Sequence, residues 1–258
     1  MKTSLQNHLS VLKEKVFTSD QYLPQFNLLL DEIASFSENL TNGETVVSLE
    51  RTILYGKSLF APFFQQANFI SLDCSPKSAE SRGSYNQTLV SDPRFIETEC
   101  EPIRCVADAL KAENNLADLL IIPNLIHHVE NQSGMFNEAF RIIKKGGRLY
   151  LFEPTLRELH QEPDDFLRYT PYGMIQALES VGFKVVDMNT TGGPFTAIAY
   201  CWTQALQYIP EHERDTWSNW FQAHFKDLET LESKYTKNLV RDYTSFPTAF
   251  AITCTKPN

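Results

Sequence analysis

Glycine, paired cysteines and basic clusters are scarce in this sequence, and each absence excludes something. Only ten of the 258 residues are glycine. The five cysteines are odd in number and form no C-x-x-C pair, which argues against a disulfide framework and against a cysteine-ligated zinc site. The 32 acidic side chains outnumber the 23 basic ones, and no basic block occurs, so a nucleic acid is not expected as a partner.

Long apolar runs are missing as well. No window of the sequence has the unbroken apolar length that a membrane span requires. Lys and Glu residues interrupt the N-terminal segment, where a signal peptide needs an apolar stretch. The sequence therefore predicts a cytoplasmic protein without a membrane partner.

The alternation of strand-like and helix-like segments predicts the fold. Apolar residues at helical spacing between residues 3 and 40 indicate two helices ahead of the first strand. Short apolar runs then alternate with amphipathic segments, which is typical of parallel strands joined by crossover helices and hence of a doubly wound α/β sheet. The predicted strands cover residues 45–49, 68–73, 103–106, 117–122, 148–153, 183–188 and 249–255.

The last two predicted strands break this alternation. A polar, aromatic-rich helical stretch, residues 195–237, separates them. We expect it to form an inserted helical layer whose aromatic side chains pack mostly on the sheet or on another subunit, as in a homodimer. The predicted organisation is a helical cap over residues 1–42, followed by one α/β domain over residues 43–258 that contains the insertion.

Ligands of a doubly wound sheet bind beyond the carboxyl ends of the strands, so the residues directly after each strand are the candidates for a site. The residues found at or just after the predicted strand ends are Glu50, Arg51, Asp73, Cys74, Asp108, Ala109, Asn124, His127, His128 and Glu153.

Two segments of the chain resemble class I S-adenosylmethionine-dependent methyltransferases, in particular the bacterial type associated with glycan and small-molecule modification. They are Leu116-Ala117-Asp118 through His127-His128-Val129 to Lys145-Gly146-Gly147, and Asp165-Phe166-Leu167-Arg168-Tyr169-Thr170-Pro171 to Gly182-Phe183. The resemblance covers about residues 44–190. It implies a Rossmann-like sheet of seven strands with the last antiparallel, S-adenosylmethionine as cofactor, and in-line methyl transfer to an oxygen or nitrogen of a small-molecule or sugar-like acceptor.

Two carboxylates suit the nucleoside part of that cofactor. Asp73, at the end of the second strand, is placed to accept hydrogen bonds from a ribose diol. Asp108, with Ala107 and Ala109 beside it, could accept from an adenine amino group and supply apolar walls. The alternatives are that Asp73 only caps the following turn and that Asp108 is an ordinary turn residue.

The first loop departs from the family pattern, which is an acid followed by glycines at every second position. The acid is Glu50, but Thr52 and Leu54 replace the first two glycines, and only Gly56 remains. Either the loop swings outward and binds the cofactor through other contacts, or the site no longer binds it.

Other side chains near this loop offer such contacts. Arg51 or Lys57 could pair with the cofactor carboxylate, and Tyr22 or Tyr55 could face the sulfonium as a cation–π partner. The alternative is that the two cations are solvated surface charges and that Tyr22 packs in the core of the cap.

The pair His127-His128 raises the question of a metal. Adjacent residues on a helix point about 100° apart, and no third ligand lies at a recognisable spacing, so the sequence predicts no metal site. We expect His127 to act as a general base for the acceptor together with Glu153. The resemblance implies that the acceptor lies near the segment after the fifth strand, where the candidate residues are Arg157, His160, Arg168 and Tyr169.

Two rival functions remain open at this point. One is a non-catalytic partner or scaffold protein that has the same fold but has lost its cofactor. The other is an enzyme that uses the fold for chemistry other than methyl transfer. A nicotinamide dehydrogenase is disfavoured, because no G-x-G-x-x-G follows any predicted strand.

Overall fold

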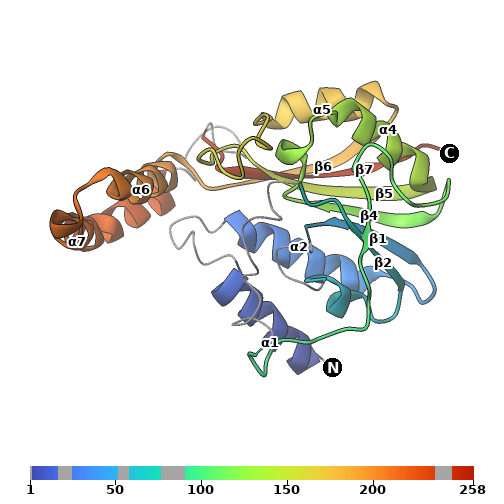
Figure 1. Cartoon of the computed structure of the whole chain (residues 1–258), viewed down its shortest axis with the longest axis horizontal. Coiled ribbons are helices and arrows are strands. Elements are labelled where there is room, and N and C mark those ends of the chain that lie inside the picture. The colour runs from blue at the N-terminus through green and yellow to red at the C-terminus, as the bar shows by residue number, and fades with distance from the viewer. Residues whose placement is uncertain (1, 17–24, 52–57, 77–90, 236–245) are drawn as a thin grey trace.

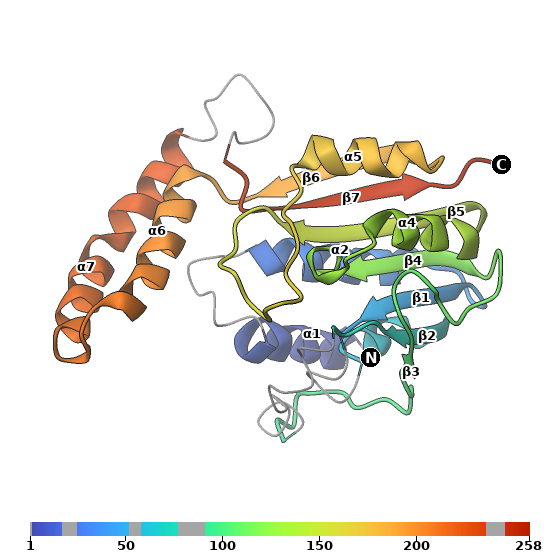
Figure 2. The same ribbon diagram turned by 45° about the horizontal axis from the view of Figure 1, so that its top comes forward.

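The centre of the molecule is a seven-stranded sheet of order β3-β2-β1-β4-β5-β7-β6. The computed structural model describes residues 2–16, 25–51, 58–76, 91–235 and 246–258. The strands are β1 (Thr45–Glu50), β2 (Asn68–Asp73), β3 (Ile103–Arg104), β4 (Ala117–Pro123), β5 (Ile143–Pro154), β6 (Lys184–Thr191) and β7 (Ala249–Thr255). β7 runs antiparallel to β5 and β6, and the pairs from β3 to β5 are parallel (Figure 2). The predicted Rossmann-like sheet with its antiparallel last strand is confirmed.

Helices cover both faces of this sheet (Figure 1). Within β4, Leu120 and Ile122 point into one core and Leu119 and Ile121 into the other, because successive side chains of a strand alternate between faces. The first core packs against α4 (Gln132–Ile142) and α5 (Pro171–Ser180), and the second against α1 (Lys2–Val11), α2 (Gln25–Asn39) and the short 3₁₀ helix η4 (Ala61–Phe64). This two-sided burial explains why the central strands are continuous apolar runs.

The two N-terminal helices form the predicted cap on one face. His8 of α1 is fully buried and bonds on both ring nitrogens: Nε2 lies 3.1 Å from the Leu59 carbonyl, and Nδ1 accepts from the Ile96 amide at 3.0 Å. Burial lowers its pKa, so the neutral ring that these two bonds require is favoured. The histidine therefore ties the cap to two loops of the α/β body.

The C-terminus of α4 is stabilised by a residue that is distant in the sequence. The helix ends at Ile142, ahead of the Lys-Lys-Gly-Gly segment, and that segment belongs to the start of β5. The cation at the helix end is the buried Lys256, whose Nζ donates to the carbonyls of Phe140 and Ile143 at 2.7 and 2.8 Å. Lys144 pairs instead with Asp118 at 2.7 Å. The macrodipole rule holds, but a residue more than 100 positions away satisfies it.

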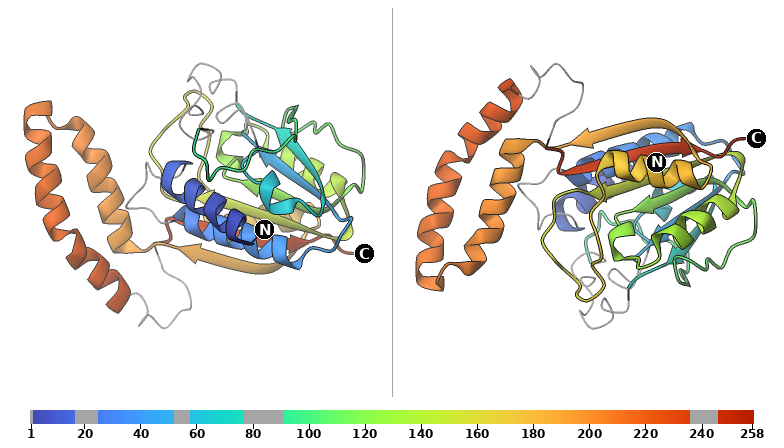
Figure 3. Two further views of the ribbon diagram at one scale, coloured as in Figure 1. Left: turned by 90° about the horizontal axis from the view of Figure 1, so that it is seen from below. Right: turned by 90° about the horizontal axis from the view of Figure 1, so that it is seen from above.

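The inserted helices lie between β6 and β7, as predicted, but they pack differently. α6 (Pro194–Ala205) and α7 (Glu211–Tyr235), joined by the 3₁₀ turn η7 (Leu206–Tyr208), project away from the sheet as a helical pair (Figure 3). Trp202 of α6 contacts the rings of Trp220 and Phe221 of α7, with centroids 5.2 and 5.8 Å apart. The expectation that these aromatics pack on the sheet is wrong, because they pack on one another.

None of the helices in the described ranges is both long enough and apolar enough to cross a lipid bilayer. The cytoplasmic location, the division into a cap and one α/β domain, and the homodimer stay predictions.

Candidate functional site

The carboxyl ends of the parallel strands meet at one edge of the sheet, and the loop that follows β5 lies at this edge (Figure 2). Glu50 ends β1, Asp73 ends β2, and Glu153 lies one residue before the end of β5. Parallel pairing brings these positions together although they are far apart in the sequence.

Glu50 turns its carboxylate into the protein. Oε1 accepts from the Ser58 hydroxyl at 2.6 Å and Oε2 from the Leu59 amide at 3.1 Å. Only 3% of the residue is exposed, and this burial raises its pKa to about 7, against the opposing effect of the hydrogen bonds. These contacts tie together the two ends of the first loop.

The pH dependence of stability should report on Glu50. Its pKa is raised from 4.5 to about 7, so the folded chain binds this proton more tightly than the unfolded chain does. The stabilisation is complete below about pH 4.5 and is lost as the pH rises through about 7. Since glutamine cannot ionise, we expect the stability of Glu50→Gln relative to wild type to rise between about pH 5 and pH 8, by up to about 3 kcal/mol at about 1.36 kcal/mol per unit.

Urea denaturation at a series of pH values measures this difference. Glu229→Gln on the exposed surface of α7 is the matched control for the removal of one carboxylate. Parallel stability curves for wild type and Glu50→Gln would contradict the assignment.

Asp73 lies where a ribose acceptor is expected. Its Oδ1 accepts from the amide of Ser75 at 3.0 Å and from the Ser75 hydroxyl, and Oδ2 lies 3.4 Å from an Arg104 nitrogen. The capping contact that the sequence offered as an alternative is therefore present. A carboxylate has about four lone-pair positions, and the two bonds from Ser75 occupy only those of Oδ1, so the group keeps capacity for the two hydroxyls of a ribose.

Two cysteines lie beside Asp73. The Sγ atoms of Cys74 and Cys105 are 3.6 Å apart, because these residues directly follow the paired ends of β2 and β3. Their mutual hydrogen bond raises the pKa of Cys74 and lowers that of Cys105 to about 7. Cys74 is buried, so its side chain packs inside the protein next to the end of β2.

Asp108 and Ala109 lie on an exposed turn after β3. The Asp108 carboxylate accepts from the side-chain amide of Asn131 at 2.9 Å, and Asn131 in turn caps the N-terminus of α4. Asn124, directly after β4, has a left-handed backbone conformation with φ of 57°. Such a conformation is uncommon for a residue other than glycine and is enriched at functional sites.

His127 and Glu153, two candidate residues that lie near strand ends, form a buried pair. His127 Nδ1 lies 2.6 Å from Glu153 Oε2, and Oε1 accepts from the amides of Leu125 and Ile126 at 2.7 and 2.6 Å. Burial lowers the pKa of His127 and raises that of Glu153 to about 7. With two amide donors on the carboxylate, the ring donates from Nδ1, and the Nε2 lone pair has no partner among the described residues.

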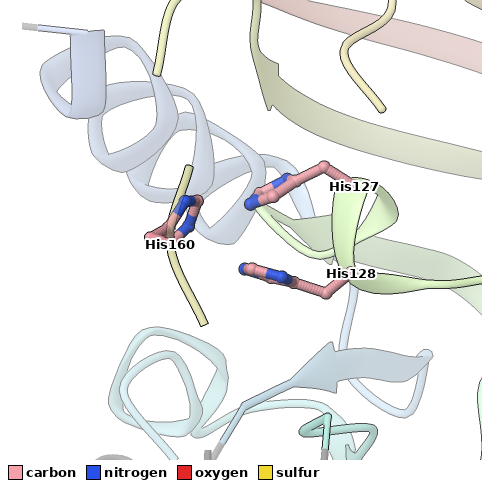
Figure 4. A group of neighbouring side chains, drawn as sticks. All are labelled: His127, His128 and His160. Carbon is pink, nitrogen blue, oxygen red and sulfur yellow. The ribbon is translucent and has the colours of Figure 1, made fainter. Parts of the chain in front are cut away.

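The structure overturns the premise that the two adjacent histidine rings diverge. They lie on the 3₁₀ turn η6 (Ile126–His128) rather than on an α-helix, and their ring centroids are 4.0 Å apart. His160, from the loop after β5, approaches both rings, with centroids 5.3 Å from His127 and 4.8 Å from His128 (Figure 4). The tight turn and a distant loop thus bring three imidazoles together.

The loop after β5 is held by an ion pair that the sequence did not reveal. Arg168 donates to Asp165 Oδ1 at 2.5 Å and to the Glu158 carbonyl at 3.1 Å. Burial opposes ionisation of Asp165, but the bonds from Arg168 outweigh it and lower the pKa of this carboxyl. Arg168 therefore anchors the segment. No local sequence signal marks Asp165 as its partner.

The other residues proposed for the acceptor are half-buried. Arg157 lies beside Glu158, with 3.4 Å between Nε and Oε1, and the Tyr169 ring packs near Phe136. Arg51 donates to the side chain of Gln161 at 3.3 Å, which links the first loop to the segment after β5. Gln161 is buried, and sequence reasoning missed it.

Several predicted cofactor contacts fall outside the described residues. These are Tyr22, Thr52 and Gly56, together with Leu54, Tyr55 and Lys57. How the replacement of glycines in the first loop affects cofactor binding therefore stays a prediction from the sequence.

Two hollows border the described residues. The larger, of about 520 Å³, lies between α1, α2 and η4 and is lined by residues that precede β1 and β2, such as Leu40 and Gln66. It is therefore near the amino ends of the strands, away from the edge where this class of sheet binds ligands. The second is a narrow hollow at that edge, lined by residues that include Glu50, Arg51 and Asn124.

Comparison with known proteins connects this geometry to an enzyme class. Residues 55–151 match the family described as a methyltransferase domain, which is less than half of the chain. Among curated proteins, none matches the sequence.

Solved structures share the fold at low sequence identity. A SAM-dependent methyltransferase from Archaeoglobus fulgidus has a TM-score of 0.51 at 13% identity, over 89% of this chain and 94% of its own. The [4+2]-cyclase SpnF has a TM-score of 0.52 at 15% identity, over 88% and 81%. A chain of the Haloferax volcanii complex that contains the Trm112 methyltransferase activator has a TM-score of 0.52 at 14% identity, over 96% and 94%.

At these identities the likeness shows a common fold and not a common substrate. The family match adds the enzyme class to the fold. Together they show a Rossmann-like sheet in which residues 55–151 match a methyltransferase domain, and this match supports an enzyme that uses S-adenosylmethionine.

Proposed function

We propose that the protein transfers a methyl group from S-adenosylmethionine to an oxygen or nitrogen of a small-molecule or sugar-like acceptor. The observation that carries this proposal is the pair His127 and Glu153, buried at the ligand edge of a methyltransferase-type sheet. In a scaffold without catalytic function we would not expect a buried carboxylate that bonds to a histidine whose Nε2 atom has no partner among the described residues.

The described residues fit the ribose end of the cofactor. Asp73 has acceptor capacity at the end of β2, and Asp108 lies exposed beyond β3, where an adenine amino group would need an acceptor. When bound, S-adenosylmethionine supplies an electrophilic methyl group whose C–S bond electrons stay with sulfur.

The chain's own contribution is positioning and proton transfer. Holding donor and acceptor in line supplies most of the rate in such a transfer. His127 presents the Nε2 lone pair that can accept the proton of the acceptor, and Glu153 holds the ring in that tautomer. The segment from Arg157 to Tyr169 is proposed to bind the acceptor. Within it, His160 contacts the histidine pair, Arg157 is a second candidate contact for the acceptor, and Arg168 holds the loop in place.

Calorimetric titration with S-adenosylmethionine and S-adenosylhomocysteine tests the proposal. We expect micromolar binding, followed by transfer of a labelled methyl group to members of a panel of hydroxyl and amine acceptors. The absence of heat and of any thermal shift at millimolar ligand would refute it. Binding without transfer to any acceptor would favour the rival, a fold used for other chemistry.

A further inference from the structure

The strongest feature outside the cofactor site is the cluster of His127, His128 and His160 (Figure 4). One ring nitrogen from each residue lies within 4.8 Å of one from each of the others. The rings of His127 and His128 extend from η6 toward His160, which reaches them from the loop after β5 (Figure 4). Three imidazoles from two separate elements thus converge on one point.

The second observation is that two of these nitrogens are buried without a partner among the residues that the structure describes. His127 and His128 are 1% and 5% exposed, and within the described ranges the Nε2 atom of each has no hydrogen-bond partner. An unsatisfied buried polar atom destabilises the folded state, so native proteins rarely keep two side by side unless a ligand satisfies them.

The third observation concerns the opposite ring nitrogens, which are all engaged. Nδ1 of His127 faces Glu153, and Nδ1 of His128 lies 2.5 Å from the Asp164 carbonyl. Nδ1 of His160 lies 3.0 Å from the Glu158 carbonyl and 3.2 Å from Asp165. Acceptors behind all three rings fix Nδ1–H and turn the Nε2 lone pairs inward, which is the arrangement found around metal-bound histidines.

From these observations we propose that His127, His128 and His160 bind one divalent first-row transition-metal ion, with Zn²⁺ as the expected ion. Three neutral imidazoles suit zinc, and three protein ligands leave a fourth, open position, as in catalytic zinc sites. Tetrahedral ligands at about 2.0–2.1 Å from zinc lie roughly 3.3 Å apart. The ring nitrogens, which lie within 4.8 Å of one another, must therefore move closer to bind one ion. A shift of His160 provides this movement, because this residue lies on a loop and is partly exposed.

The proposed site rests on the imidazole geometry and changes the proposed function at one point, the role of His127. If both hold, His127 is a ligand rather than the base, and the ion binds the acceptor oxygen or nitrogen at its open position. The acceptor then releases its proton to water, because a bound divalent ion lowers the pKa of such a group. The methyl transfer itself is unchanged.

Metal binding by the full-length protein tests this inference directly. Chelator-treated protein is titrated with ZnCl₂ by calorimetry, and metal content is measured after dialysis. We expect one equivalent of zinc per chain with micromolar or tighter affinity, and a loss of at least about 100-fold in His160→Ala. His212→Ala, on the exposed surface of α7, is the matched control and should bind like wild type.

Cobalt substitution identifies the ligands. A Co²⁺ complex with three imidazoles should show visible bands of four- or five-coordinate cobalt without a thiolate charge-transfer band. A thiolate band would place the ion at Cys74 and Cys105 and overturn the assignment, as would zinc affinity that is equal in wild type and His160→Ala.

The outcome is separable from that of the proposed function. Binding of S-adenosylhomocysteine is measured with and without zinc. Zinc binding without nucleoside binding would support the metal site and refute the methyltransferase proposal. Nucleoside binding by a protein that binds no zinc would support the methyltransferase proposal and refute the metal site.

Discussion

Asp73→Asn is expected to weaken binding of S-adenosylhomocysteine by about 30- to 1000-fold. Two ribose hydroxyls donating to a carboxylate form charge-assisted hydrogen bonds, and their loss corresponds to about 2–4 kcal/mol. An asparagine keeps the shape but replaces one acceptor oxygen with a donor, so it can accept from only one hydroxyl. Calorimetric titration at constant pH and salt measures the change.

Two further variants separate ribose binding from a purely structural role. Ser75→Ala removes the hydroxyl that caps Asp73 but leaves the carboxylate, so its affinity should stay within a few-fold of wild type. Asp227→Asn, exposed on α7, controls for the loss of a negative charge. If Asp73→Asn lowers the melting temperature but leaves the affinity unchanged, Asp73 is only a cap and the proposed cofactor contact is wrong.

Glu153→Gln is expected to switch the tautomer of His127 and to lower the rate of methyl transfer by about 10²- to 10⁴-fold. The glutamine carbonyl can still accept from the amides of Leu125 and Ile126, so the turn should persist. Its amide group then faces His127 and donates to Nδ1, which moves the ring proton to Nε2 and removes the inward lone pair. A carboxylate that only orients a catalytic histidine produces losses of this size in serine proteases.

Two-dimensional NMR correlation of the imidazole nitrogens measures the tautomer without any knowledge of the acceptor. In wild type, Nδ1 of His127 should carry the proton, and in Glu153→Gln it should be Nε2. Affinity for S-adenosylhomocysteine should not change, which a general loss of structure would not allow. Glu179→Gln, exposed on α5, is the matched control. An unchanged tautomer in Glu153→Gln would show that the carboxylate does not position this ring.

The positions of the strands along the chain were predictable, because local patterns determine them. Leu119–Ile122 in β4 is apolar throughout, since both faces of the sheet are covered, and turn residues mark the ends of such runs. The candidate positions at the strand ends followed from the same pattern, and the contact between His127 and Glu153 confirmed that the two lie at one edge. The boundary of α4 was less predictable, because Lys256 from the end of the chain stabilises its last carbonyls.

The sequence by itself determined the doubly wound sheet and the edge that carries the candidate site, because these depend on periodicity and on the ends of strands, whereas the antiparallel last strand followed only from the family resemblance. Only the tertiary structure decided how the site is assembled. A 3₁₀ turn places His127 and His128 side by side, and the ion pair of Arg168 with Asp165 holds the loop that brings His160 to them. Contacts between residues more than 30 positions apart leave no periodic signal, so no spacing in the sequence could reveal this cluster.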